Sequence, residues 1–305
     1  MGLIVENVTK TYVDKKVVDN ISFEINHPGV FALLGTNGAG KTTTIRMMLG
    51  IIKKDSGKIT WNGKNVDRKS VNFGYLPEER GIYPKTRIID QLIYFAKLKG
   101  MKKEEAEKSI DYWLERLKMK EYKNQLAEKL SKGNQQKIQF ITAIMHDPDL
   151  IVLDEPFSGL DPVNTELLKD VILELVGKGK YIVMSSHQMN SVEQFCQDLV
   201  ILNKGKTIVK GKLDDIKETY PITKIEIDTK DDISSLVNEE GLAVKEHKDK
   251  KYIIEFKEKI QSTKLLERLV KEKVKLEKFE LIRPSLHEIF IEKVGEEQWE
   301  IYILL

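Results

Sequence analysis

The chain of 305 residues is long enough for two domains. Its 41% hydrophobic and 32% charged residues exclude a disordered chain and a membrane-embedded one. Fifty basic residues against 48 acidic ones leave a formal charge of +2, which gives no electrostatic reason to expect nucleic acid as a partner. The single cysteine, Cys196, excludes an internal disulfide and a cysteine-rich metal site, and fits a reducing compartment. No hydrophobic run is long enough for a membrane-spanning helix or a signal peptide.

Up to about residue 215, short apolar strands alternate with helices. The expected strands are Leu3–Val5, Val17–Val18, Ile21–Ile25, Val30–Leu34, Leu150–Leu153 and Tyr181–Ser185. Helices are expected at Thr42–Leu49 and Glu166–Val176, and the Lys- and Glu-rich stretch from about Ile88 to Lys129 has helical periodicity. Buried strands that alternate with helices predict an α/β fold, with a parallel sheet covered on both faces.

The composition changes near Tyr220, and the segment from 221 to 295 predicts a second, smaller α+β domain before a tail at 296–305. Its expected order of elements is β-α-β-β-α-β, a ferredoxin-like arrangement. One of its helices, at about Ser262–Glu272, would place Leu265, Leu266, Leu269 and Val270 on one side. Ser285 and Glu288 have the spacing of a capping box at the start of a last helix.

A phosphate-binding loop follows the strand Val30–Leu34. Residues 35–42, Gly-Thr-Asn-Gly-Ala-Gly-Lys-Thr, fit the pattern G-x-x-x-x-G-K-[ST], and a helix follows. Glycines let backbone amides converge on phosphate oxygens, and the helix N-terminus favours negative charge. Lys41 would reach the outer phosphates, and Thr42 would offer its hydroxyl to Mg²⁺. The predicted nucleotide-binding residues here are Gly35, Asn37, Gly38, Ala39, Gly40, Lys41, Thr42 and Thr43.

Two carboxylates end the apolar strand Leu150–Leu153. Asp154 and Glu155 would point in different directions at the end of a strand, so that one can serve the metal while the other faces an attacking water. The alternative is a strand that merely ends in acidic turn residues. The phosphate loop argues against that alternative.

The segment Leu130-Ser131-Lys132-Gly133-Asn134-Gln135-Gln136 resembles the signature L-S-G-G-Q of ATP-binding cassette (ABC) ATPases. With it, residues 1–220 resemble one ABC cassette, a mixed-sheet core with a helical subdomain at about 80–147. Other motifs of the family appear in order along the chain: Tyr12 stands where an aromatic residue stacks on adenine, Asp161 lies in the D-loop, and His187 matches the switch histidine. Each has a plainer alternative: Tyr12 as an exposed strand aromatic, His187 as a structural histidine, and Ser131 and Asp161 as helix N-caps.

The chain departs from the family pattern in two places. Lys132 and Asn134 stand where Gly and Gln are usual in the signature, while Ser131 and Gly133, the phosphate-facing pair, are kept. Glu78 replaces the usual Q-loop glutamine within Gly74–Arg80. Glu keeps an oxygen ligand for Mg²⁺ but adds a charge near the triphosphate, which puts the usual role of this position in doubt.

The resemblance implies an ATPase that uses ATP and Mg²⁺, with Glu155 as general base and His187 holding the γ-phosphate. Thr42, Asp154 and Glu78 are the expected metal ligands. Family members close head to tail, so that the signature of one cassette, here Ser131 and Gly133, completes the ATP site of the other. Because the chain carries one phosphate loop and one signature, it is expected to pair with a second copy or a homologue.

The resemblance also implies a separate membrane permease, which would hold the chain at the cytoplasmic face of the cell membrane. The segment Glu78–Leu92 matches the one that receives a short helix of the permease, with Ile82, Tyr83, Ile88 and Ile89 as candidate contacts or, alternatively, ordinary core. The C-terminal domain is similar to the extension of NatA-type sodium and multidrug exporter cassettes, which favours export of ions, drugs, peptides or lipids.

Two other functions are compatible with parts of the sequence. A soluble single-cassette ABC ATPase, for example one in iron–sulfur assembly, fits the cassette but does not need the domain after residue 220. A nucleotide-gated scaffold without hydrolysis is disfavoured by the presence of both Asp154 and Glu155. The apolar tail Trp299–Leu305 would be either a docking segment or an incidental terminus.

Overall fold

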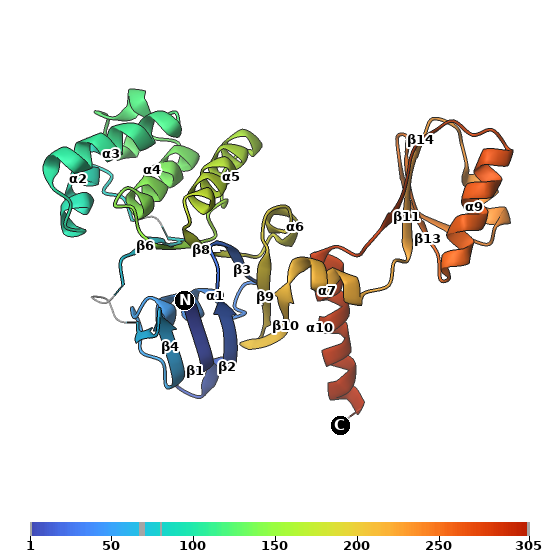
Figure 1. Ribbon diagram of the computed structural model, residues 1–305, viewed down its shortest axis with the longest axis horizontal. Helices are drawn as coiled ribbons and strands as arrows, with labels where there is room; N and C mark the ends of the chain where they lie inside the picture. Colours follow the sequence, from blue (N-terminus) through green and yellow to red (C-terminus); the bar gives the residue numbers. More distant parts are fainter. Residues whose placement is uncertain (1, 67–70, 80, 304–305) are drawn as a thin grey trace. The chain divides into compact units, whose positions relative to one another are not determined.

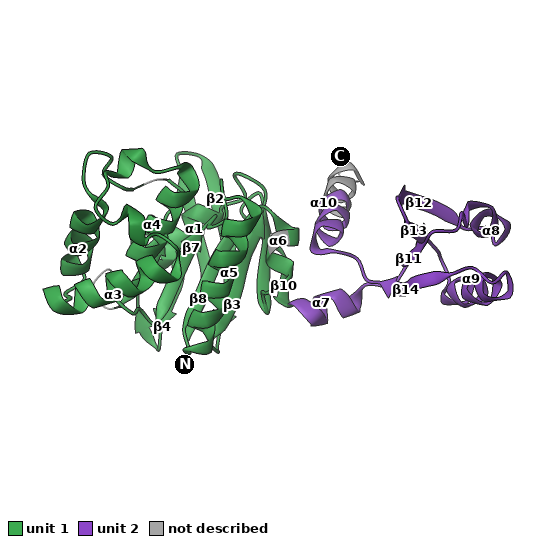
Figure 2. Cartoon of the chain, turned by 90° about the horizontal axis from the view of Figure 1, so that it is seen from above, with its two compact units in different colours: residues 1–212 green, residues 213–305 purple. Residues whose placement is uncertain are grey.

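The computed structural model describes residues 2–66, 71–79 and 81–303, so Arg80 of the variant Q-loop and the last two residues of the tail lie outside it. The chain divides into two compact units, residues 1–212 and 213–305 (Figure 2). The sequence placed the boundary near 220. The division falls earlier because helix α7 (Leu213–Thr219) groups with the second unit.

A six-stranded sheet forms the centre of the first unit (Figure 1). Its order is β10-β9-β3-β8-β7-β6, and all neighbours are parallel except β10, which runs antiparallel to β9. The strands are β3 (Gly29–Gly35), β6 (Phe73–Leu76), β7 (Leu150–Asp154), β8 (Tyr181–Ser186), β9 (Asp198–Asn203) and β10 (Lys206–Lys212). Every residue of β3 and β7 is buried, as expected for strands covered on both faces.

A second, antiparallel sheet has the order β2-β1-β4-β5. Its strands are β1 (Leu3–Tyr12), β2 (Lys15–Ile25), β4 (Ser56–Trp61) and β5 (Lys64–Asn65). Helix α1 (Lys41–Met48) and the inward faces of both sheets share one hydrophobic core. Phe23 of β2 stacks on Phe31 of β3 within it, with ring centroids 4.8 Å apart. This core fixes the position of the phosphate loop, which joins β3 to α1.

The remaining helices of the first unit gather mainly between β6 and β7 in the chain, as the helical subdomain shown in green in Figure 1. They are α2 (Ile88–Leu98), α3 (Lys103–Arg116), two 3₁₀ turns (Lys120–Tyr122 and Ala127–Lys129) and α4 (Lys132–Ile144), followed later by α5 (Pro162–Gly177) and α6 (Met189–Glu193). The expected N-caps are confirmed: the side chain of Ser131 accepts from Asn134 N–H before α4, and that of Asp161 accepts from Asn164 N–H before α5. No helix among the described residues is long and apolar enough to cross a membrane.

The second unit contains the expected β-α-β-β-α-β sequence, flanked by α7 and by α10 (Leu286–Ile303). Its elements are β11 (Lys224–Thr229), α8 (Ser234–Glu239), β12 (Ala243–Lys248), β13 (Lys251–Glu255), α9 (Lys259–Lys271) and β14 (Leu276–Ile282). The sheet order β12-β13-β11-β14 is that of a ferredoxin-like fold, which confirms the prediction. The capping box is also confirmed, because Ser285 N–H donates to Glu288 and Glu288 N–H donates to the Ser285 hydroxyl.

The second unit has its own hydrophobic core, separate from that of the first unit. Leu265 and Leu269 of α9 are fully buried in it against Ile225 and Ile254. Val270, expected on the same side, is 62% exposed, so that part of the prediction is wrong. At 100° per residue, Val270 lies a quarter-turn away from Leu269 and outside the narrow stripe that meets the sheet.

The pair Leu269 and Val270 therefore tests whether the two cores unfold independently. We expect Leu269→Ala to lower the stability of the second unit by about 2–5 kcal/mol, through lost burial and the cavity left behind. Val270→Ala, one residue away and exposed, serves as the control and should change it little. Native-state hydrogen exchange reports the two units separately. An equal loss of protection in β3 and β7 would contradict the independence of the cores.

Candidate functional site

The phosphate loop closes around its own lysine. Helix α1 begins after Gly40, whose φ of 102° lies in the left-handed region, and a Cβ there would lie 2.7 Å from the carbonyl oxygen of Val17. Lys41 is 6% exposed and donates to the carbonyls of Gly35 and Thr36 at 2.9 and 3.2 Å. The ammonium is thus held under the loop, at the start of a helix that favours anions.

A pocket of about 270 Å³ lies over this loop. It is lined by Val17, Asn37, Gly38, Ala39, Gly40, Lys41, Thr42, Thr43, Glu78 and Glu155. The structure therefore brings together most of the predicted loop residues with one of the two strand-end carboxylates and with the variant Q-loop residue. Backbone amides, a buried ammonium and a helix N-terminus on one small pocket suit it to phosphate groups.

Glu155 lies between two basic side chains. It is 6% exposed, and its carboxylate oxygens lie 3.4 Å from Lys41 Nζ and 2.9 Å from His187 Nδ1. The residue follows β7 with φ of 51°, a strained left-handed conformation for a non-glycine residue. Its backbone N–H donates to the hydroxyl of Ser185 at 3.0 Å. This turn, rather than simple strand alternation, sends Asp154 and Glu155 in different directions.

Asp154 is fully buried at the end of β7, next to Ser185 of β8. Burial raises the pKa of its carboxyl, and hydrogen bonds from Ser185 and Thr42 oppose that shift. Ser185 donates to Oδ1 at 2.5 Å, whereas Oδ2 has no hydrogen-bond partner among the described residues. An unpartnered, buried carboxylate oxygen beside a threonine hydroxyl fits a divalent cation, which would favour the charged form.

Magnesium usually binds to one or two carboxylates together with substrate phosphates and water. Asp154 supplies one such carboxylate, next to the hydroxyl of Thr42. Thr42 and Glu78, whose side chain is exposed, both line the phosphate pocket, whereas Asp154 lies behind Thr42 and is not among the lining residues. These three residues could hold the metal beside a bound triphosphate.

Tyr12 lies at the end of β1 with 47% of its side chain exposed. The ammonium of Lys10 lies 5.3 Å from the centre of its ring and also pairs with Asp55 at 2.7 Å. The cation holds the ring in place from one side. Tyr12 is not among the residues that line the phosphate pocket, and its stacking on adenine stays a prediction.

The signature residues form a second cluster. Gly133, in the first turn of α4, faces the D-loop: a Cβ there would lie 3.3 Å from the Leu160 side chain. Ser131 and Asp161 cap the helices α4 and α5 beside it. None of these residues lines the pocket over the phosphate loop of the same chain. The predicted site residues therefore fall into two groups on one chain.

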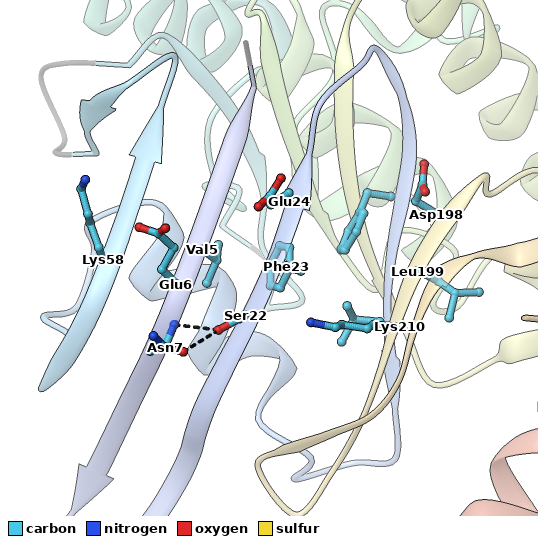
Figure 3. A pocket seen from close by; sticks show the side chains of 13 residues that line it. Val5, Glu6, Asn7, Ser22, Phe23, Glu24, Lys58, Asp198, Leu199 and Lys210 are labelled. Atoms are coloured by element: carbon cyan, nitrogen blue, oxygen red, sulfur yellow. Dashed lines mark hydrogen bonds between the residues drawn. The ribbon is translucent and has the colours of Figure 1, made fainter. Parts of the chain in front are cut away.

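A larger cavity, of about 750 Å³, lies elsewhere in the first unit, between β1 and β2 on one side and β9 and β10 on the other (Figure 3). Phe23 lies on its apolar side, while Glu6, Glu24, Lys58 and Lys210 supply charges of both signs. It contains none of the motif residues, and its mixed charges do not converge on one point. Size alone does not mark the functional pocket here.

Three residues near the site were not singled out from the sequence: Val17, Ser185 and Gly205. Ser185 could have been found, because it lies at the same level as Asp154 on the neighbouring parallel strand. Val17 gave only a strand signal, although it lines the phosphate pocket. Gly205 lies 164 positions after Lys41 in a turn whose contacts with the loop depend on the tertiary fold.

Comparisons with known proteins agree with this geometry. Residues 18–158 match the family model described as ABC transporter, and residues 211–294 match the C-terminal domain of DrrA1-3-like ATP-binding proteins. The ABC transporter ATP-binding protein YhaQ of Bacillus subtilis (strain 168) is 49% identical over 96% of this chain and 98% of its own length.

Two further matches cover less of the chain. Linearmycin resistance ATP-binding protein LnrL of Bacillus subtilis (strain 168) is 34% identical over 69% of this chain and 69% of its own length. A solved ATP-binding subunit of an ABC transporter matches with a TM-score of 0.67 and 30% identity, covering 72% of this chain and 93% of that structure. The chain belongs to the ABC transporter family, as an ATP-hydrolysing, ATP-binding subunit with a DrrA-like C-terminal domain.

Proposed function

We propose that this chain hydrolyses MgATP at the pocket over the phosphate loop, with Glu155 as general base, and so drives an exporting membrane permease. The contact of Glu155 with both Lys41 and His187 carries the proposal. Lys41 lies under the loop that would hold the phosphates, so Glu155 stands where an attacking water would meet the γ-phosphate. His187 would keep that phosphate in place, while Thr42, Asp154 and Glu78 would hold Mg²⁺.

The separation of the two clusters supports action as a dimer. Ser131, Gly133 and Asp161 do not line the phosphate pocket of their own chain. A helix N-terminus capped by a serine is itself suited to an anion. A second copy or a homologous cassette, placed head to tail, would bring these residues onto the γ-phosphate and enclose it.

Export is supported by what several relatives are named for. They include the lipopolysaccharide export ATP-binding protein LptB of Haemophilus influenzae (28% identical, covering 73% of this chain and 95% of LptB) and Nod factor export ATP-binding protein I of Burkholderia pseudomallei (34% identical, 68% and 69%). A soluble ABC ATPase is the second candidate. This candidate is less favoured because a soluble ABC ATPase does not need the C-terminal domain. That domain matches a family model at residues 211–294, and YhaQ aligns with this chain over 98% of its own length.

A groove in the helical subdomain is the proposed contact for the permease. It has a volume of about 420 Å³ and is lined by Tyr75, Pro77, Gly81, Ile82, Phe95, Leu98, Lys99, Gln139, Thr142 and His146. Gln139 Oε1 and His146 Nδ1 are buried there without a hydrogen-bond partner among the described residues. An apolar groove with unpartnered polar atoms suits a segment that brings both apolar side chains and hydrogen-bonding groups.

The candidate permease contacts expected from the sequence differ in their exposure and in their position relative to this groove. Ile82 lines the groove, and Tyr83 is 53% exposed beside it, stacked on Phe95. Ile88 is fully buried, so its side chain belongs to the core of the subdomain and is not available to a partner. Ile89 is partly buried and does not line the groove.

Glu155→Gln tests the general base. We expect turnover to fall by about 10²–10⁴-fold, since glutamine cannot accept the proton from water, while ATP affinity is kept. Phosphate release and calorimetric ATP binding measure the two effects. Glu166→Gln, a change to an exposed carboxylate on α5, is the matched control and should hydrolyse ATP normally. Full turnover by Glu155→Gln would remove Glu155 from this role.

Lys41→Ala tests the phosphate pocket. Charge-assisted hydrogen bonds are worth about 1.5–3 kcal/mol, so the dissociation constant for ATP should rise about 10-fold to 150-fold. The exposed Lys53→Ala provides the control for loss of one positive charge. Equal ATP affinities of the two variants, measured by calorimetry, would show that the nucleotide binds elsewhere.

The permease is tested by recovery from detergent-solubilised membranes with tagged Glu155→Gln protein and MgATP. We expect a stoichiometric polytopic membrane protein to co-purify. Adding Leu98→Glu, which puts a charge into the groove, should abolish this, whereas Leu173→Glu on the similarly exposed face of α5 should not. Recovery of soluble partners alone would favour the soluble ATPase, and equal loss with both leucine variants would exclude the groove as the contact.

A further inference from the structure

The turn between β9 and β10 consists of two residues, Lys204 and Gly205, between Asn203 and Lys206. Their φ angles are 47° and 83°, so both lie in the left-handed region, as in a type I′ hairpin. Lys204 is exposed and Gly205 is buried. The sequence shows only an ordinary Lys-Gly hairpin turn, but its buried half meets two other segments of the first unit.

Both backbone groups of Gly205 are bonded outside the hairpin. Its N–H donates to the carbonyl of Ala39, inside the phosphate loop, at 3.1 Å. Its carbonyl accepts from the N–H of Asp19, in β2, at 2.8 Å. The turn therefore connects the phosphate loop to β2 through two hydrogen bonds, one to each segment.

The space beside Gly205 is filled by Val17. A Cβ on Gly205 would lie 2.6 Å from the Val17 carbonyl oxygen, a distance that real Cβ atoms essentially never reach. The same oxygen is 2.7 Å from the Cβ position of Gly40, which precedes α1. The backbone of Val17 thus lies between the phosphate loop and the turn, with no room for a side chain from either, and Val17 also lines the phosphate pocket.

We propose that Gly205 is a positioning residue for ATP: it fixes the Ala39 carbonyl and the Val17 backbone, and so the direction of the loop amides toward the phosphates. Gly205 itself does not line the pocket, and it acts through Ala39 and Val17. The inference rests on the assignment of the phosphate-loop pocket to ATP.

Alanine at Gly205 is compared with alanine at Gly179, which precedes β8. The two glycines have nearly the same φ, 83° and 80°, so alanine costs similar backbone strain at both. Nothing lies within 4 Å of a Cβ at Gly179, whereas at Gly205 the Val17 backbone must move. The Gly179→Ala variant therefore controls for strain without displacing the loop.

We expect Gly205→Ala to raise the dissociation constant for MgATP about 10-fold to 100-fold, the equivalent of losing about one charge-assisted hydrogen bond between a loop amide and a phosphate. Calorimetry on the full-length chain, in a Glu155→Gln background that prevents turnover, measures it. With Glu155 intact, KM should rise while kcat changes little. Glu155 and His187 are positioned by the ends of β7 and β8, which Gly205 does not contact through its backbone hydrogen bonds. Gly179→Ala should lower Tm through its backbone strain alone, by no more than Gly205→Ala does, and leave both the dissociation constant and KM unchanged.

Gly205→Asn separates collision from strain, since asparagine tolerates a left-handed φ but carries a Cβ. It should keep more of the stability than Gly205→Ala and still bind ATP weakly. Wild-type ATP affinity in either variant at 205, or an equal loss in Gly179→Ala, would overturn the proposal. If Lys41→Ala weakens ATP binding while Gly205→Asn does not, this inference fails alone. If Lys41→Ala leaves ATP affinity unchanged, the assignment of the pocket to ATP fails, and this inference fails together with that assignment.

Discussion

A carboxylate that is almost completely withdrawn from water needs compensating partners, and Glu155 has two, the ammonium of Lys41 and the imidazole of His187. Desolvating a charge costs several kcal/mol unless nearby groups compensate for it. Lys41 comes from the phosphate loop and His187 follows the end of β8, so these two contacts of Glu155 join three separate parts of the chain. The left-handed backbone of Glu155 is kept because Ser185 holds its N–H from the neighbouring strand. The loop, the strand ends and the histidine are therefore one electrostatic unit.

Much of this unit could be predicted from the sequence. The phosphate loop could be predicted from residues 35–42 alone, because the spacing of their glycines depends on the local backbone geometry and not on distant segments. Asp154 and Glu155 follow from a run of buried residues that ends in two acids. The N-caps Ser131 and Asp161 are also local, because each depends on a side chain and an N–H three residues away. The ferredoxin-like order of the second unit follows from alternating and helical periods, although Val270 shows that a period does not fix the width of the buried stripe.

What the sequence could not predict are contacts between segments far apart in the chain. Ser185 meets Asp154 only because β7 and β8 pair in one register. Gly205 meets Ala39 only because β9 lies beside β3 and its hairpin turns back over the phosphate loop. The division of the site residues into two clusters is likewise a property of the folded cassette. In the sequence, Lys41 and Ser131 belong to successive motifs, and only the fold shows that Lys41 lines the phosphate pocket while Ser131 does not. Local motifs identify the chemistry, while the pairing of strands decides which residues support it.

The junction between the two units has a consequence for how such proteins diversify. β10 ends at Lys212 and pairs along its length with β9, so the last strand of the first unit is held by a strand of that same unit. The second unit has its own core and caps its own last helix. A gene could thus gain, lose or exchange the segment after Lys212 without altering the strands that hold the phosphate loop. YhaQ aligns over 96% of this chain and LnrL over 69%, and separate family models match residues 18–158 and 211–294, a pattern consistent with inheritance of the two parts as separate modules.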